Sequence, residues 1–295
     1  MLHDHRQTRP RRVRRRAVSL TFKAISLYGF LSFSAGALAA DPPPPPAAPT
    51  ATYARLADLV IASPAIATVK VKPIVALPPE RAPGLSPGQV RFYVEGETAG
   101  LIRGDSVIAR KVSFLIDGPA TKAKKPALKN RTLILFGKVG ARVDQLQLTS
   151  STAALDWSAS NEALVRKVLK DAIAKDLPPA ITGISSAFHV AGAIRGEGET
   201  QIFLETPDGS PISLSVIRRP DEQPHFSASL GEIVDDSASI PEPETMLWYR
   251  LACGLPASLP SGALNQLEAA DAQAATRAYE AFRQALAPGD RRGKA

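Results

Sequence analysis

Hydroxyl, imidazole and carboxylate side chains crowd into one short glycine-rich segment of the chain. Ser185 and Ser186 precede His189, and Glu197 and Glu199 follow. A serine nucleophile needs a base to take its proton and a carboxylate to orient that base, so these side-chain types could serve a hydrolase. The same segment could instead be a flexible or ligand-binding loop between two strands, because its three glycines make the backbone permissive.

The familiar catalytic motifs are missing from this segment. It contains no Gly-x-Ser-x-Gly turn, and residues 192–198 lack the Gly-Lys-Ser/Thr end of a phosphate-binding loop. We therefore favour recognition over catalysis, assign no catalytic residue, and expect the binding residues to be His189, Arg195, Glu197 and Glu199. The alternative is a periplasmic hydrolase that uses Ser186, His189, Glu197 and Glu199.

Side chains that bind metals are too few to form a recognisable site. After the first 39 residues only His189 and His225 remain as histidines, and Cys253 is the one cysteine of the chain. Because no zinc-ligand spacing can be written from them, we expect no metal and no other cofactor. Cys253 continues the helix face of Met246 and Tyr249, and we expect it to be buried.

The net charge of +8 belongs almost entirely to the N-terminus. Residues 1–40 contain eight basic side chains and one acidic one, which leaves 28 basic against 27 acidic residues in the rest of the chain. This nearly neutral remainder lacks the basic stripe with interleaved aromatics that nucleic-acid binding requires. We expect no nucleic-acid partner.

The N-terminus has the three-part layout of a secretory signal peptide. A basic run precedes the apolar stretch 24–33, and Ala37-Leu38-Ala39 fits the small-x-small cleavage rule. We expect residues 1–39 to be removed on export to the periplasm or beyond. An inner-membrane anchor formed by residues 24–40 is the alternative, and an uncleaved segment would be the only contact with the membrane. The proline-rich stretch 40–52 should be an extended linker.

Hydrophobic spacing predicts a short helix and then five strands. Tyr53, Leu56, Ala57 and Val60 recur at helical spacing, after which the period changes to two. Three strands alternate apolar and polar residues, a fourth is continuously apolar, and a fifth alternates again; they lie at 67–72, 90–95, 111–116, 132–136 and 145–148. Without a long helix between them, these strands predict a small antiparallel barrel.

The rest of the chain mixes a second β region with helices. Ser160 is a candidate cap for a helix through Lys175, and Thr206-Pro207-Asp208-Gly209-Ser210 is a strong turn signal between two strands. Asn265 and Glu268 could form a capping box for a last helix.

We expect an α+β protein with an N-terminal small antiparallel OB-like β-barrel, a helix, a second antiparallel β-meander and C-terminal helices. The expected divisions are a signal peptide at 1–39, a linker at 40–52, a barrel domain at 53–157, an α+β domain with a β-hairpin at 158–260, a C-terminal helix at 261–288 and a tail at 289–295.

Two resemblances go with these patterns. The helix end Leu56–Val60, the segment 90–104 with its Leu-Ile-Arg-Gly ending, and the strand 131–136 resemble the small OB-fold and netrin-like barrels of secreted bacterial proteins over residues 53–150. The eukaryotic inhibitor modules of that kind carry disulfides, whose cysteines are absent here. At 183–206 and 247–253 the chain also resembles an uncharacterised family of secreted alphaproteobacterial proteins, which implies no activity.

These observations together favour a non-enzymatic function. The expected export, balanced charge, small β modules and missing catalytic motif predict a binding or interaction protein of the cell envelope. Its partner would be an envelope protein or another envelope component.

Overall fold

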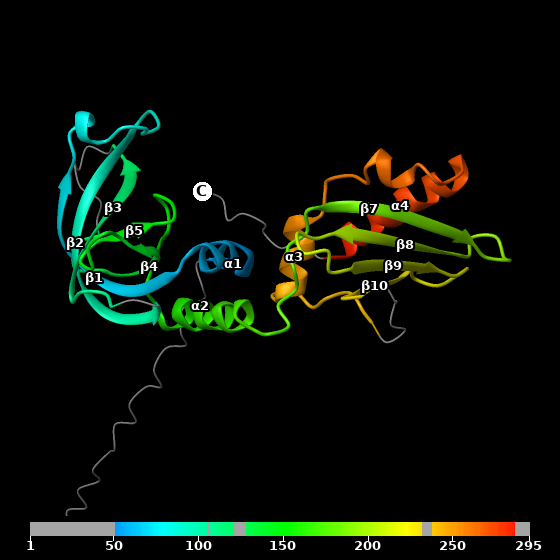
Figure 1. The fold of residues 1–295 in the computed structure, drawn as a ribbon, viewed down its shortest axis with the longest axis horizontal. Coiled ribbons are helices and arrows are strands. Elements are labelled where there is room, and N and C mark those ends of the chain that lie inside the picture. The colour runs from blue at the N-terminus through cyan, green and yellow to red at the C-terminus, as the bar shows by residue number, and fades with distance from the viewer. Residues whose placement is uncertain (1–50, 105–106, 121–127, 232–237, 287–295) are drawn as a thin grey trace, which may run out of the picture. The chain divides into compact units, whose positions relative to one another are not determined.

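The helical pattern near residue 53 and the alternating pattern after it form a helix followed by a β-sheet, as the sequence predicts (Figure 1). The computed structural model describes residues 51–104, 107–120, 128–231 and 238–286. The expected signal peptide, the alternative membrane anchor and the C-terminal tail all lie outside the described residues. Within the described stretches, no helix combines the length and the apolar character needed to cross a membrane.

The first helix, α1 (Tyr53–Ala62), is amphipathic and capped at its start. The hydroxyl of Thr52 accepts a hydrogen bond from the backbone N–H of Arg55 at 3.3 Å, which satisfies one of the first free amides of the helix. Tyr53, Leu56, Ala57 and Val60 are buried along one face, and the extended residue Ser63 ends the helix before Pro64. The predicted short helix is confirmed.

The strands that follow α1 form a nearly closed antiparallel barrel. This sheet A has six strands in the order β3-β2-β1-β4-β5, and β6 pairs with β4 on the same edge as β5. Its strands are β1 (Ala65–Ala76), β2 (Gln89–Arg103), β3 (Lys111–Pro119), β4 (Thr132–Val139), β5 (Leu146–Leu148) and β6 (Ala154–Asp156). A single parallel bridge between Ser113 and Gln145 brings β3 to the start of β5. The predicted barrel is confirmed, although α1 precedes it and it is therefore not strictly N-terminal.

Alternation decides which side chains fill the barrel. Facing pairs such as Phe92 with Ile116 and Val94 with Phe114 are buried, whereas the residues between them point outward. Residues 133–137 of β4 are buried without interruption, because β4 is covered on both faces. Gly137 lies where β5 crosses this strand, and a Cβ there would stand 2.2 Å from the carbonyl oxygen of Gln147.

The second helix, α2 (Ala159–Ala172), starts and ends earlier than the sequence predicts. Its N-cap is Ser158 and not Ser160, because the extended backbone at Ser158 lets its hydroxyl accept from the N–H of Asn161 at 3.1 Å. The Asn161 side chain in turn donates to the carbonyl of Asp156 at 2.8 Å, which ties the helix to the end of β6. The helix stops at Ala172, short of the expected Lys175.

A second sheet, B, is a four-stranded antiparallel meander in the order β10-β9-β8-β7. Its strands are β7 (Gly183–Ala191), β8 (Gly198–Glu205), β9 (Ile212–Arg218) and β10 (His225–Ser229). The predicted hairpin between β8 and β9 is confirmed: Gly209 has φ of 75°, and the carboxylate of Asp208 accepts from the N–H of Ser210 at 3.2 Å. One face of the sheet packs against α4 (Ala269–Ala285), where Phe226 meets Phe282 edge-on at 6.0 Å.

The C-terminal elements are α3 (Met246–Gly254), the 3-10 turn η2 (Ser261–Leu264) and α4. The capping box predicted at Asn265 is wrong, because α4 begins only after Glu268, which is its N-cap and makes no side-chain cap bond. The continuous helix expected over 261–288 is therefore a short turn followed by α4. The observed folds of both sheets match the predicted α+β class, and the division into domains at 157 and 260 stays a prediction.

Cys253 is exposed, so the expectation that it lies in the core is wrong. Met246 and Tyr249, whose face it was expected to share, are buried, as are Trp248, Leu251 and Ala252. Cys253 follows Tyr249 by one helical turn and lies next to the last residue of α3, Gly254. Helical spacing therefore indicated a buried face, but the burial does not extend to the last turn of the helix.

A first prediction concerns the close approach at Gly137. Gly137→Ala should lower the free energy of unfolding by about 2 to 3 kcal/mol, since the new Cβ must push the backbone of β5 away. Urea denaturation followed by circular dichroism measures the change. Gly262→Ala in η2 is the matched control, because no atom lies within 4 Å of its Cβ position. Equal midpoints for the two variants would contradict this account of β5.

A second prediction concerns the exposed thiol. Cys253→Ala should change the free energy of unfolding by less than about 0.5 kcal/mol, because no buried volume is lost. In the native protein, a thiol reagent should label Cys253 within about tenfold of its rate in urea, because access to the sulfur does not require unfolding. Labelling that waits for global unfolding would show that the side chain is buried.

Candidate functional site

His189 lies on β7 and interacts with the neighbouring strand. Its Nδ1 is 2.9 Å from the hydroxyl oxygen of Thr200, the residue directly opposite it on β8. Thr200 is buried and His189 is half-buried. The imidazole is therefore held by a cross-strand contact within sheet B.

The other predicted binding residues lie around the turn between β7 and β8. Glu197 closes this turn: its backbone carbonyl accepts from the N–H of Gly192 at 3.0 Å, and its carboxylate accepts from the N–H of Ile194 at 3.5 Å. Arg195 is exposed in the same turn. Glu199 accepts a hydrogen bond from the side-chain amide of Gln201 at 2.8 Å.

The register of β7 and β8 keeps Ser186 apart from His189, the two residues that would have to interact in a hydrolase. His189 pairs with Thr200, whereas Ser186 pairs with Phe203. Because successive side chains alternate between the two faces of a sheet, Ser186 points to the face opposite that of His189. The structure does not bring this hydroxyl within reach of the imidazole, which a nucleophile and its base require.

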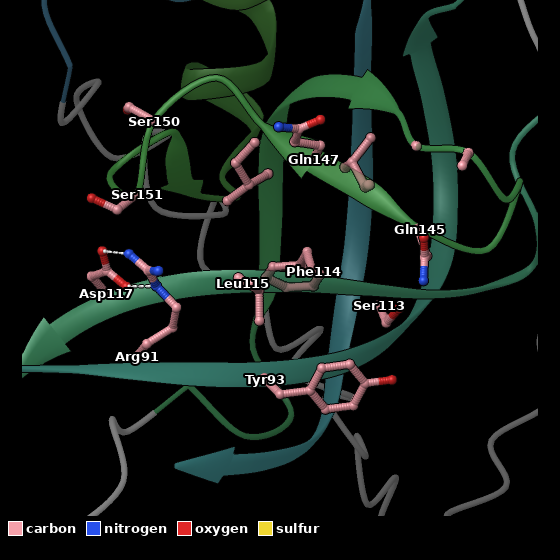
Figure 2. Close-up of a pocket in the computed structure, with 14 residues that line it drawn as sticks. Arg91, Tyr93, Ser113, Phe114, Leu115, Asp117, Gln145, Gln147, Ser150 and Ser151 are labelled. Carbon is pink, nitrogen blue, oxygen red and sulfur yellow. Dashed lines mark hydrogen bonds and ion pairs between the residues drawn. The ribbon is translucent and has the colours of Figure 1, made fainter. Parts of the chain in front are cut away.

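Outward-facing side chains of β2 and β3 form a groove on the barrel, which the sequence reasoning did not identify as a site. Arg91 faces Asp117, Tyr93 faces Leu115, and Glu95 faces Ser113 across the two strands. The groove has a volume of about 610 Å³ and continues onto the β4–β5 loop, β5 and the residues after it. Figure 2 shows Gln147 across from Leu115, and Ser150 and Ser151 across from Arg91 and Asp117.

An ion pair closes one end of this groove. The guanidinium of Arg91 donates two parallel hydrogen bonds to the carboxylate of Asp117, from Nε at 2.7 Å and from Nη2 at 2.9 Å (Figure 2). Its Nη1 also donates to the carbonyl of Pro83 in the β1–β2 loop at 3.2 Å. The hydrogen bonds to Asp117 raise the pKa of Arg91, so the guanidinium stays charged and its position is fixed.

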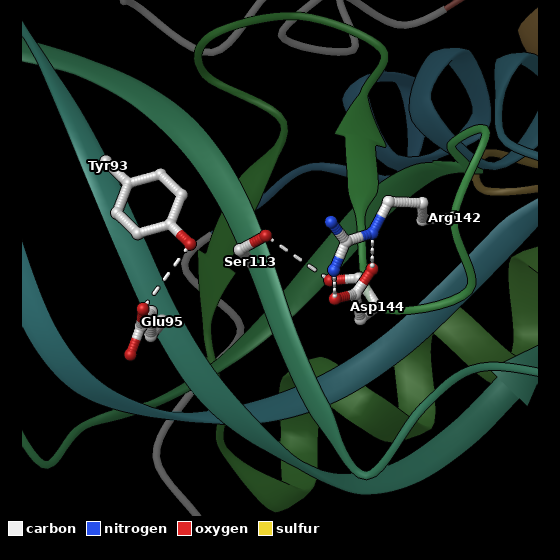
Figure 3. Close-up of polar contacts among 5 residues, drawn as sticks. All are labelled: Tyr93, Glu95, Ser113, Arg142 and Asp144. Atoms are coloured by element: carbon white, nitrogen blue, oxygen red, sulfur yellow. Dashed lines mark hydrogen bonds and ion pairs between the residues drawn. The ribbon is translucent and has the colours of Figure 1, made fainter.

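A second set of polar contacts joins β3 to the β4–β5 loop (Figure 3). Ser113 donates twice to the carbonyl of Asp144, from its backbone N–H at 2.8 Å and from its hydroxyl at 3.3 Å. Arg142 donates to the carboxylate of Asp144, and this hydrogen bond lowers the pKa of Asp144. On β2, the hydroxyl of Tyr93 donates to Glu95 at 3.4 Å. The contacts that Ser113 and Arg142 make with Asp144 fix the loop that forms one wall of the groove.

Charges around the groove cancel one another. An adjoining hollow of about 380 Å³ shares Tyr93 and Ser113 with the groove and adds an ion pair between Lys72 and Glu97 at 3.3 Å. The two hollows are lined by three cations and four anions, and Arg142, which pairs with Asp144, supplies a fourth cation; the lining residues are Lys72, Arg91, Lys111, Glu95, Glu97, Asp117 and Asp144. The charges of this surface therefore balance and produce no net positive field.

The groove follows an open seam between β3 and β5. Ser113 directs its N–H across the seam to Asp144, so by alternation Leu115 and Asp117 direct their N–H and C=O groups to the same side. On the opposite wall, the N–H of Thr149 donates to the carbonyl of Phe136 in β4. By alternation, the backbone N–H and C=O groups of Leu148 point toward the seam. Within 107–120 and 128–231, the Ser113–Gln145 bridge is the only strand pairing between β3 and β5.

The signal for this groove was present in the sequence but incomplete. Alternation in 90–95 and 111–116 identified the outward positions, among them Arg91, Tyr93 and Ser113. It could not show that the two strands are neighbours, that Arg91 faces Asp117, or that the loop before β5 covers their end.

No metal site accompanies the groove in the part of the chain that the structure describes, because no group of three or more His, Cys, Asp or Glu side chains lies together there. Comparison with models of known protein families finds no match. Comparison with curated proteins finds no match either.

Proposed function

We propose that this chain is an exported, non-enzymatic binding protein of the cell envelope, and that it holds an extended segment of a partner polypeptide in the seam between β3 and β5. The observation that carries the proposal is the row of backbone groups at Leu115 and Asp117 that face the seam without a strand partner among the described residues. An extended peptide can satisfy such groups by adding a strand to the edge.

Barrel topology supports this location. We infer that the barrel is OB-like, because its five main strands close only partly and β3 meets β5 in a parallel bridge. Barrels of that kind bind ligands on the face of their second and third strands and with the loop between the fourth and fifth strands. The groove occupies those same elements.

Side chains of the groove indicate the chemistry of the segment. Tyr93 and Leu115 lie side by side and offer apolar surface, and Leu115 is 44% exposed. Gln145, Gln147 and Ser151 add neutral hydrogen-bonding groups. Because the charges are paired locally, the partner segment that fits is uncharged, extended, and carries one apolar side chain for Tyr93 and Leu115.

Export rests on the N-terminal sequence. The basic run, apolar stretch and small residues of 1–39 support a signal peptide, and the near-neutral remainder suits a protein that binds another protein. Intact-mass analysis of the protein from a periplasmic fraction tests this part. A start near residue 40 supports it, whereas a species that keeps Met1 and sediments with membranes contradicts it.

The seam is tested with a random dodecapeptide library displayed on phage and panned on the purified protein. We expect enrichment of uncharged peptides with one large apolar residue. When such a peptide binds, amide exchange should slow at Leu115 and Asp117, because their N–H groups gain acceptors. Phe114 and Ile116 are internal controls, because they direct their N–H groups toward β2 and should already be protected before the peptide binds.

A proline substitution in β3 tests directly whether the backbone N–H at the seam binds the peptide. Leu115→Pro should weaken peptide binding by about tenfold or more relative to Leu115→Ala, since only the proline removes the N–H that faces the seam. Ile173→Ala, an exposed apolar position on another element, controls for general effects. Failure to enrich any peptide, or protection that spares Leu115 and Asp117, would overturn the proposal.

A further inference from the structure

Trp157 forms one wall of a separate hollow on the barrel. The hollow has a volume of about 460 Å³, and Trp157 is 47% exposed, whereas Trp248 is 4% exposed. Its other lining residues come from β1, β2, β4 and α2; they are Thr68, Ala99, Gly100, Ile102, Thr132, Glu162 and Arg166. None of these residues belongs to the groove between β3 and β5.

The exposed indole is held in one orientation. Its Nε1 donates to the Oε2 atom of Glu162 at 2.6 Å, and its backbone N–H donates to the carbonyl of Thr132 at 2.9 Å. The Oε1 atom of Glu162 accepts from Nε and Nη2 of Arg166 at 2.9 and 2.7 Å. An aromatic ring that is fixed before binding loses little conformational entropy when a ligand covers it.

Small residues keep the hollow open beside this ring. Ala99 and Gly100 lie on β2 opposite a register shift between Thr68 and Val69 of β1. A Cβ at Gly100 would stand 3.0 Å from the hydroxyl of Thr68, which itself donates to the carbonyl of Gly100 at 3.3 Å. A β-bulge beside a hollow is a recurrent feature of binding sites.

The side chains of the hollow are complementary to an uncharged ring that carries hydroxyl groups. The indole offers a flat apolar face, and the paired Glu162 and Arg166 offer acceptors and donors at its edge with no net charge. Arg166 is 55% exposed on its side chain and can donate outward. A pyranose has one apolar C–H face and equatorial hydroxyls, and so matches both features.

We propose that Trp157 and the Glu162–Arg166 pair form a binding site for a pyranose ring of a neutral oligosaccharide. The hydrogen bond from Trp157 and the ion pair with Arg166 lower the pKa of Glu162, so that its carboxylate remains an acceptor. The site stands on its own residues and does not depend on the peptide seam.

Intrinsic fluorescence tests the site, because Trp157 is the exposed one of two tryptophans. Titration with cellotetraose, chitotetraose and maltotetraose should give saturable quenching or a blue shift with at least one of them, and should protect Trp157 from acrylamide. Isothermal titration calorimetry gives the affinity independently of the fluorophore. Trp157→Ala should weaken binding by about tenfold or more, and Trp157→Phe should retain part of it.

Two further variants separate the hollow from the general surface. Gly100→Val should abolish binding by filling the hollow. Phe188→Ala, which removes another exposed aromatic ring on sheet B, should leave the affinity unchanged. Circular dichroism confirms that each variant is folded, and unchanged peptide protection at Leu115 in the Trp157 variants shows that the two sites are independent. No saturation with any of the three sugars, or an affinity that persists in Trp157→Ala, would overturn the proposal.

Discussion

Both candidate sites depend on the pairing of one buried strand, β4. On one edge it pairs with β1, and on the other it pairs with β5 and β6 in succession. Because Gly137 has no side chain, β5 can approach β4 closely, and β5 forms the wall of the seam opposite β3. The pairing of Leu133 with Asp156 places the residue that follows β6, which is Trp157. A strand that is buried from residue 133 to residue 137 therefore positions two exposed surfaces through the elements that pair with its edge.

The sequence predicted which segments form strands better than it predicted which strands pair with one another. The continuously apolar run at 132–136 identified a strand covered on both faces, and alternation identified the strands that are covered on one face. Register lies beyond such patterns, because side chains that repeat every second residue are compatible with many pairings. The ion pair of Arg91 with Asp117 exists only in the register that β2 and β3 adopt, and so the groove could not be predicted.

Residue chemistry alone was a weak guide to the site. The segment around His189 contained every side-chain type that a hydrolase needs, yet local contacts within the β7–β8 hairpin account for His189, Glu197 and Glu199. Trp157 was not singled out, because a lone aromatic residue between a strand and a helix has no periodic signal. Trp157 becomes a candidate binding residue only because α2 begins at Ala159 and so brings Glu162 and Arg166 to the edge of the indole ring.

Local neutralisation of charge links the two sites. The charges are paired as Arg91 with Asp117 in the groove, as Lys72 with Glu97 in the hollow that adjoins it, and as Arg166 with Glu162 beside Trp157. Exposed pairs of this kind add little to stability, but they leave no net field to draw a charged partner. Selection at these surfaces must then come from shape, from the unpaired edge of β3 and from the fixed face of Trp157. The two proposed ligands, a neutral polypeptide segment and a neutral sugar ring, belong to classes that such features can distinguish from charged polymers.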